Sequence, residues 1–343
     1  MAILNFACAE DGVVQEPGSV FGTVQISAAQ ARTGAKSFEI PVCDDWYGED
    51  KNGIVLNSPD RTEFYAQGSL FPTCPATWYF NSNGWKLLAW RNGTTVMGCI
   101  TLDWHSTGMK VYVGDKATLV GTIGDGIVVN NWTMLEVRVV VGASGTIQVR
   151  MNGLVVFTFN GNTQPGTATT INNMVYYVVP MWNHGAGLAS TYWDDLLIND
   201  ALGSKFNSWP NGVKIHRRKM VSAGTYAQWT PQGAETNVAC VNEDVPSMDT
   251  YVEPTAPGQK DSYVPEDAPE GLTGIAAVAF RYWGQGGGTI KRLCRLDGTD
   301  YLGDPLSLSG SFNHVDDFMY TKPGGGGWDI LTFNAIEAGM EGE

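Results

Sequence analysis

The segment from Trp132 to Phe159 constrains the fold most, because it predicts consecutive antiparallel strands. In residues 135–141, Leu and Val alternate with Glu136 and Arg138. This period of two is typical of a strand with one buried and one solvent-facing side. A Gly/Ser turn follows, and residues 147–151 repeat the alternation. We therefore expect two neighbouring strands of one antiparallel sheet.

A tight hairpin joins this pair to a third predicted strand. Asn152-Gly153 separates two apolar runs, and these residue types suit a type I′ turn, in which both central residues need a positive φ. Residues 154–159 are mainly apolar, so we expect that strand to be covered on both faces. Three strands need a partner layer to bury their apolar side. The rest of residues 1–200 is expected to supply that layer.

The composition is that of a turn-rich globular protein. The 343 residues are 43% hydrophobic and include 42 Gly, which favours many turns over long helices, and the length suggests about two domains. Acidic residues number 35 against 21 basic ones, for a net charge of −14. Because nucleic-acid binding needs a basic surface, the charge argues against that class of partner.

Neither a targeting signal nor a membrane span is expected. The N-terminus, MAILNFACAEDG, has no charged n-region and no apolar run long enough for a signal peptide. No stretch approaches the roughly 20 apolar residues of a membrane helix. The six cysteines lie far apart without a C-x-x-C motif, so buried free thiols of a protein assembled in the cytosol are expected.

Composition divides the chain into three parts. Residues 1–202 read as short strands separated by Gly and Asn turns, the pattern of a sandwich or jelly roll. Residues 203–270 are rich in Pro, Asp, Glu, Thr and Ser and predict an extended connector. Residues 271–343 predict a smaller β-rich domain. In it, Gly271–Trp283 and Thr289–Leu296 are expected to form a hairpin, and Trp328–Gly339 a short helix ended by Gly339.

Several short motifs follow one another in an order known from one family. The matching residues are Ala31-Arg32-Thr33-Gly34-Ala35, Asn131-Trp132, Glu136-Val137-Arg138-Val139, Gly145, Val149 through Gly153, and Tyr192-Trp193-Asp194-Asp195-Leu196 through Asp200. They resemble the concanavalin A-like (laminin G-like) jelly roll of virion proteins of tailed bacteriophages. The glycine-rich tail from Pro323 to Gly339 is similar to the ends of such proteins. The resemblance implies a virion component, often of the tail or host-contact apparatus.

Concanavalin A-like folds also include glucanases, whose activity requires catalytic carboxylates. Retaining glycoside hydrolysis needs two carboxylates about 5–5.5 Å apart, which a Glu-x-Asp-x-Glu strand would provide. No such motif occurs in the chain. Asp194 and Asp195 are adjacent, so on a regular strand they face opposite sides. We expect them to accept hydrogen bonds from nearby loop amides rather than to form a catalytic pair.

Other catalytic and metal signatures are weak. The chain has no G-x-S-x-G elbow, no H-E-x-x-H motif and no cluster of Cys and His at zinc spacing. The four histidines are isolated from one another in sequence. The acidic residues of one loop are candidate ligands of calcium, although they lack EF-hand spacing. These residues are Asp44, Asp45, Glu49 and Asp50.

Two groups of residues are candidates for binding. The first comprises aromatic and histidine side chains flanked by polar residues, which suit a sugar or, alternatively, close the ends of the sandwich or a subunit interface. They are Trp46, Tyr47, Trp182 and His184. The second is the dense basic run in this acidic chain, which would suit an acidic patch on a partner. It contains Lys214, Arg217, Arg218 and Lys219.

Together these observations lead to a functional hypothesis. The chain is expected to be a structural and adhesion component of a tailed-phage virion, assembled in the cytoplasm of the bacterial host and without enzymatic activity. The tail or host-contact apparatus is the expected position, and capsid decoration is the alternative. Expected partners are other virion proteins, copies of the same chain and a host surface glycan, with no cofactor. A free carbohydrate-binding lectin or a glycan-degrading enzyme is the alternative from another class.

Overall fold

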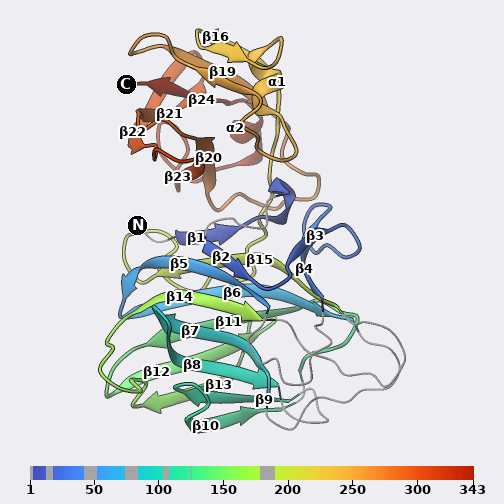
Figure 1. The fold of residues 1–343 in the computed structure, drawn as a ribbon, viewed down its shortest axis with the longest axis vertical. Coiled ribbons are helices and arrows are strands. Elements are labelled where there is room, and N and C mark those ends of the chain that lie inside the picture. Colours follow the sequence, from blue (N-terminus) through green and yellow to red (C-terminus); the bar gives the residue numbers. More distant parts are fainter. Residues whose placement is uncertain are drawn as a thin grey trace. The chain divides into compact units, whose positions relative to one another are not determined.

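The computed structural model describes residues 3–12, 18–41, 52–73, 84–102, 108–124, 126–177 and 190–343. The chain forms two compact units, Met1–His216 and Arg217–Glu343. Both are built almost entirely from antiparallel strands (Figure 1), and the first is a two-layered sandwich. The predicted all-β jelly-roll class is confirmed.

One layer of the first unit is an eight-stranded sheet, called sheet A here. Its order is β13-β12-β11-β6-β15-β4-β3, and β1 also pairs with β15. The strands are β1 (Ile3–Ala7), β3 (Gln25–Ser27), β4 (Ser37–Pro41), β6 (Glu63–Pro72), β11 (Thr133–Val140), β12 (Gly145–Met151), β13 (Leu154–Gly161) and β15 (Ser190–Asp200). A short 3-10 helix, η1 (Ala9–Asp11), follows β1.

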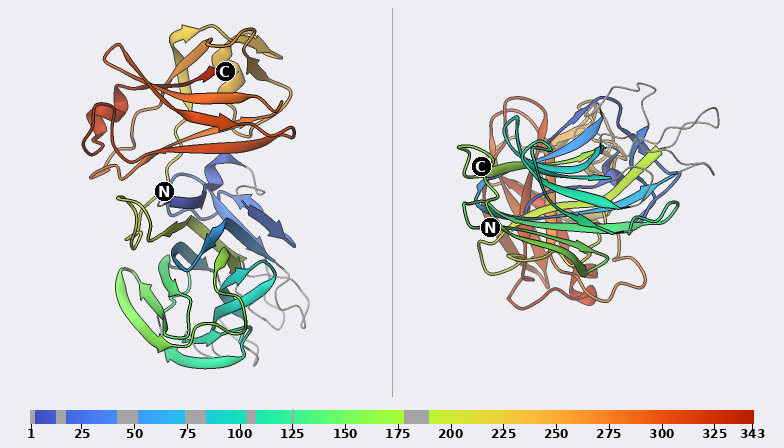
Figure 2. Two further views of the ribbon diagram at one scale, coloured as in Figure 1. Left: turned by 90° about the vertical axis from the view of Figure 1, so that its left-hand side faces the viewer. Right: turned by 90° about the horizontal axis from the view of Figure 1, so that it is seen from below.

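The other layer is a seven-stranded sheet, called sheet B here. Its order is β10-β9-β8-β7-β14-β5-β2, and the two layers can also be followed in Figure 2. The strands are β2 (Gly18–Phe21), β5 (Gly53–Arg61), β7 (Lys86–Asn92), β8 (Thr95–Leu102), β9 (Met109–Val113), β10 (Thr118–Ile123) and β14 (Ile171–Tyr177).

The predicted meander is confirmed as β11, β12 and β13. Val137 on β11 pairs with Val149 on β12, and both are fully buried in the core between the sheets. At the hairpin, Asn152 and Gly153 have φ angles of 49° and 82°, as a type I′ turn requires. Four cysteines in the described part of the chain are buried free thiols, namely Cys8, Cys99, Cys240 and Cys294.

The prediction that residues 154–159 are covered on both faces was wrong. β13 is the last strand of sheet A, and Leu154, Val155 and Val156 are 73%, 52% and 39% exposed. An apolar run usually indicates a strand in the middle of a sheet. Here the strand pairs only with β12, and none of the described strands pairs with its outer edge.

Residues 201–216 belong to the first unit, and we call them the strap. After β15 the strap lies against the outer face of sheet A. There Trp209 contacts Tyr65 and Val213 contacts Gln67.

The second unit begins at Arg217 and has a five-stranded sheet of order β16-β19-β24-β21-β22. Two further strand pairs, β17-β18 and β20-β23, complete it. The elements are β16 (Met220–Ala227), β17 (Thr230–Gln232), α1 (Asn237–Val241), β18 (Tyr251–Glu253), β19 (Lys260–Pro265), β20 (Val278–Gly284), β21 (Thr289–Leu296), β22 (Thr299–Ser307), β23 (Asn313–Met319), α2 (Ile330–Asn334) and β24 (Glu337–Gly342).

The expected connector over 203–270 is therefore corrected. Its first part is the strap, and the rest supplies β16, β17, α1, β18 and β19 to the second unit. These strands are short and polar, so they lack the apolar alternation by which a strand is recognised in sequence. The expected boundaries of 1–202, 203–270 and 271–343 give way to one division after His216.

Two local predictions in the second unit also differ from the structure. β21 pairs with β22 and β24, while β20 pairs with the distant β23, so the predicted hairpin does not form. The C-terminal helix is present but ends at Asn334, and Gly339 lies in β24. A Cβ on Gly339 would lie 2.0 Å from the carbonyl oxygen of Asp261. This glycine therefore permits close strand contact rather than ending a helix.

Candidate functional site

The outer face of sheet A carries an accessible array of polar and aromatic side chains. Because the apolar residues of β11 and β12 point into the core, their alternate neighbours point outward. We call this surface the sheet A platform. It consists of Glu63, Tyr65, Arg138, Thr146, Gln148, Arg150, Thr158, Asn160 and Trp209.

The edge of the platform is a ladder of uncharged polar pairs. Thr146 Oγ1 donates to Asn160 Oδ1 over 3.0 Å, and Gln148 Nε2 donates to Thr158 Oγ1 over 3.1 Å. These are directly opposed cross-strand pairs of β12 and β13. Both hydrogen bonds are exposed to solvent, so further donors and acceptors of the same groups remain accessible to a ligand.

The middle of the platform contains an ion pair over an aromatic ring. Arg138 Nε lies 2.8 Å from Glu63 Oε1, and the Tyr65 hydroxyl donates to the same oxygen over 2.9 Å. The Arg138 guanidinium lies 5.8 Å from the centre of the Tyr65 ring. Burial and the hydrogen bond to Glu63 raise the pKa of Tyr65. The phenol therefore stays protonated and donates at neutral pH.

Trp209 forms an aromatic wall on the side of the platform away from β13. Its ring lies 4.0 Å from the Arg150 guanidinium carbon and meets the Tyr65 ring edge-on at 5.5 Å and 72°. Arg150 also donates to Asn211 Oδ1 over 3.2 Å. The strap thus brings an aromatic ring beside the polar ladder, and an arginine holds that ring by a cation–π contact.

Beneath the strap, the same sheet face is polar but closed. Gln67 Nε2 donates to the Val213 carbonyl over 2.7 Å, and Glu136 Oε1 accepts from the Asn211 amide over 2.6 Å. Burial raises the pKa of Glu136. Among the described residues, four buried atoms here lack a hydrogen-bond partner. They are Gln67 Oε1, Ser69 Oγ, Glu136 Oε2 and Asn199 Oδ1.

Asp194 and Asp195 accept hydrogen bonds from backbone amides of nearby loops, as predicted. The inference that their side chains face opposite sides of the sheet was wrong. Asp195 has a φ of 52° beside a β-bulge, which turns its carboxylate toward the loop that Asp194 also reaches. Asp194 Oδ2 accepts from the amides of Arg32 and Thr33 over 2.8 and 3.0 Å. Asp195 Oδ2 accepts from Arg32 Nη1 over 2.5 Å and from Thr33 Oγ1 over 2.9 Å.

This carboxylate pair is buried, with Asp194 5% and Asp195 0% exposed. Burial, together with the negative charge of Asp195, raises the pKa of Asp194 to about 7. Asp195 Oδ1 also accepts from the Ile215 amide over 2.8 Å and so fixes the end of the strap. The pair connects three segments of the fold and does not open to a ligand.

The residues proposed from sequence for sugar and calcium binding lie outside the described residues. These are Trp46, Tyr47, Trp182 and His184 for sugar, and Asp44, Asp45, Glu49 and Asp50 for calcium. Both proposals remain predictions. Among the residues that the structure describes, no group of three or more His, Cys, Asp and Glu side chains is arranged to hold a metal ion.

The basic run makes contacts within the second unit. Arg217 donates to the carbonyls of Asp244 and Glu243, and Lys219 pairs with the Asp244 carboxylate. Arg218 Nη1 lies 3.6 Å from Glu266 Oε2. Lys214 is exposed on the strap. A partner contact through these residues remains a prediction.

No family model matches the chain, and no curated protein sequence matches it. Solved structures share its β-sandwich architecture at low identity. Endo-β-1,4-glucuronan lyase from the fungus Trichoderma reesei is 10% identical over 55% of this chain and 93% of its own, with a TM-score of 0.41. The marine PL-14 alginate lyase from Aplysia kurodai is 11% identical over 58% and 97%, with a TM-score of 0.37.

Another similar structure is domain 4 of the extracellular arabinanase AbnA from Geobacillus stearothermophilus, solved in complex with arabinotriose. It is 17% identical over 55% of this chain and 80% of its own, with a TM-score of 0.33. These proteins act on or bind carbohydrate by their descriptions. Likeness at this level concerns the fold, and nothing in it concerns phage particles.

The expectation of a protein without enzymatic activity is corrected by this comparison, because two of these similar structures are polysaccharide lyases. The Glu-x-Asp-x-Glu strand is a signature of the carboxylate pair of glycoside hydrolases. A lyase instead abstracts a proton next to a carbonyl group, a step for which Tyr, His or Lys also serves. The absence of Glu-x-Asp-x-Glu therefore has no bearing on lyase chemistry.

Proposed function

We propose that this chain binds a polysaccharide along the sheet A platform. The observation that carries the proposal is the exposed ladder of Gln148–Thr158 and Thr146–Asn160 beside the Trp209 wall. Sugars present rows of hydroxyl groups and apolar C–H faces. Amide and hydroxyl side chains bond the hydroxyl groups, and an aromatic ring contacts the C–H face.

The charges favour a neutral glycan over a polyanion. Arg138 is neutralised by Glu63 at 2.8 Å, and the Arg150 guanidinium is engaged by the Trp209 ring. The whole chain carries a net charge of −14, which repels a polyanion at long range. A chain of neutral hexoses would need only the hydrogen-bonding groups and the aromatic wall of the platform.

Calorimetric titration tests the proposal with a soluble neutral β-glucan and with alginate as the acidic counterpart. Gln148→Ala removes an exposed amide of the ladder. We expect it to weaken glucan binding about fivefold, because one such hydrogen bond contributes roughly 1 kcal/mol. The matched control is Gln232→Ala, which removes an amide that donates to Glu253 in the second unit. This control should bind like the unmodified protein.

Several outcomes would refute the proposal. They are the absence of binding to both glycans, equal weakening by the two glutamine variants, and tighter binding of alginate than of glucan. The same mixtures should be assayed for release of shorter chains. Glycan shortening that Gln148→Ala slows would add catalysis to binding at the platform.

We also propose a setting for this binding, supported by the sequence resemblance of short motifs. They comprise residues 31–35, 131–132, 136–139, 145, 149–153, 192–200 and 323–339. The chain would be a structural and adhesion component of a tailed-phage virion, assembled in the bacterial cytoplasm. Antibody-labelled imaging of purified particles tests this setting. Label on the tail would support host contact, and label on the head would support capsid decoration. The absence of label would refute a virion role and favour a free lectin.

A further inference from the structure

An uncharged surface with exposed apolar side chains lies where both sheets of the first unit end. β13 is the last strand of sheet A and β10 the last strand of sheet B. The two strands are in close contact, since a Cβ on Gly121 of β10 would lie 2.4 Å from the ring of Phe157 on β13. Figure 1 shows both strands at the same side of the sandwich.

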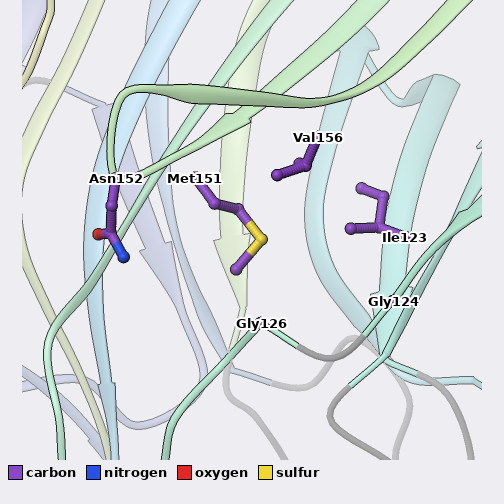
Figure 3. A pocket seen from close by; sticks show the side chains of 6 residues that line it. All are labelled: Ile123, Gly124, Gly126, Met151, Asn152 and Val156. Atoms are coloured by element: carbon purple, nitrogen blue, oxygen red, sulfur yellow. The ribbon is translucent and has the colours of Figure 1, made fainter.

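The two strands expose large apolar side chains beside uncharged threonine and asparagine side chains. Leu119 on β10 is 51% exposed, and Leu154 and Val155 on β13 are 73% and 52% exposed. An open pocket of about 350 Å³ lies between the end of β10 and the start of β13. Figure 3 shows the side chains of Met151, Val156 and Ile123 gathered around it. Exposed apolar side chains on unpaired edge strands indicate an interaction site.

Exposed edge strands are normally protected, because their free N–H and C=O groups pair with other chains. Lysine, proline or a covering segment usually provides the protection. β13 and β10 contain no charged residue and no proline, and no Asp, Glu, Lys or Arg occurs from Met151 to Trp193. Among the described strands, none pairs with the outer edge of either strand.

We propose that this surface binds a second copy of the chain by antiparallel pairing of β13 with β13. Antiparallel pairing of two identical strands is symmetric, so residues near the twofold axis meet themselves or their neighbours. Any charge there would face a like charge. An uncharged strand is the composition that such pairing requires, in a chain whose net charge of −14 otherwise keeps copies apart.

Such a dimer would continue sheet A from one copy into the other. The Thr158 and Asn160 ends of the two platforms would then adjoin. The dimer rests on the edge strands alone and not on glycan binding. If the platform binds a polysaccharide, two adjoining platforms would bind a long chain more tightly than a short one.

Sedimentation velocity of the full chain over a range of concentrations tests the proposal. We expect a monomer–dimer equilibrium that shifts toward dimer as salt rises, because salt screens the repulsion between two acidic copies while the apolar contact remains. The double variant Leu154→Lys with Val155→Lys should weaken the dimer at least about a hundredfold. Leu331→Lys, at a residue 84% exposed in the second unit, is the matched control and should leave it unchanged.

Cysteine cross-linking provides the second readout. Of single cysteines placed at Val155, Thr158 and Asn160, at least one should form an intermolecular disulfide, while Ser222→Cys in the second unit should form none. A monomer at every concentration and salt would overturn the proposal. So would a dimer that the lysine pair does not weaken, or the absence of cross-links from all three positions. A dimer that dissociates as salt rises would also overturn it, since that behaviour indicates ion pairs.

Discussion

The buried carboxylate of Asp194, next to that of Asp195, links the stability of the first unit to pH. Arg32 contacts the Asp195 carboxylate and donates its backbone amide to Asp194. Its guanidinium therefore offsets one of two buried negative charges. Two buried carboxylates beside one guanidinium cannot both ionise without cost. This explains why the pKa of Asp194 is raised to about 7.

The raised pKa predicts a loss of stability with rising pH. In the unfolded chain Asp194 ionises near pH 4, whereas in the folded chain it keeps its proton to about pH 7. Between these values the folded state binds more protons, so the free energy of unfolding falls as pH rises. Urea titrations should show a decrease on the order of 3 kcal/mol from pH 4.5 to pH 8.

The Asp194→Asn variant should lack this part of the decrease, because its side chain does not titrate. Asp249→Asn, at an exposed residue of the second unit, serves as the control and should follow the unmodified protein. Identical pH profiles for the protein and Asp194→Asn would show that the pair does not hold a proton.

At the scale of elements, the strap is bound differently from the strands beneath it. β11 is bonded on both sides by β6 and β12 and contributes Val137 and Val139 to the core. The strap instead rests on a polar face where four buried atoms lack partners among the described residues. Each such atom costs roughly 1–3 kcal/mol. The strap should therefore open at a lower free energy than the sheet.

Hydrogen exchange tests this difference. The amides of Asn211 and Ile215, bonded to Glu136 and Asp195, should exchange at least about tenfold faster than those of Val137 and Val139. Trp209→Ala removes the contacts with Arg150 and Tyr65 and should speed strap exchange by roughly another tenfold.

The matched control for the strap is Trp132→Ala. Trp132 packs against Phe71 on the same sheet, and its replacement should leave strap exchange unchanged. Protection of Asn211 and Ile215 equal to that of β11 would contradict the prediction and show that the strap opens only with the whole unit.

At the scale of the whole molecule, the chain divides into two units with separate cores. The first core lies between sheets A and B, and the second contains Phe280, Cys294 and Trp328. Residues 1–216 and 217–343 should therefore each fold alone, as judged by cooperative thermal unfolding. A fragment of residues 1–202 lacks all but the first two residues of the strap. Its Tm should therefore lie several degrees below that of 1–216. Equal Tm values would show that the strap adds nothing to the stability of the first unit.

The sequence alone predicted those features of the fold that depend on a few neighbouring residues. The alternation in β11 and β12 and the Asn152-Gly153 turn are properties of a few neighbouring residues, because side-chain period and turn conformation depend on the local backbone. The solvent-facing residues Arg138, Gln148 and Arg150 could be assigned to the outer face from that alternation. Their role as a platform could not, because any exposed strand face is polar.

Tertiary structure decided what depends on residues far apart in the chain. The position of β13 at an edge follows from which strands pair, and an apolar run reads alike in the centre and at the edge of a sheet. Trp209 joins the platform only because the strap lies across β6 and β12. In the sequence Trp209 is flanked by polar residues, as in a linker. The bulge at Asp195 brings two carboxylates to one loop. Each of these outcomes comes from long-range pairing and packing, whose energy no local pattern contains.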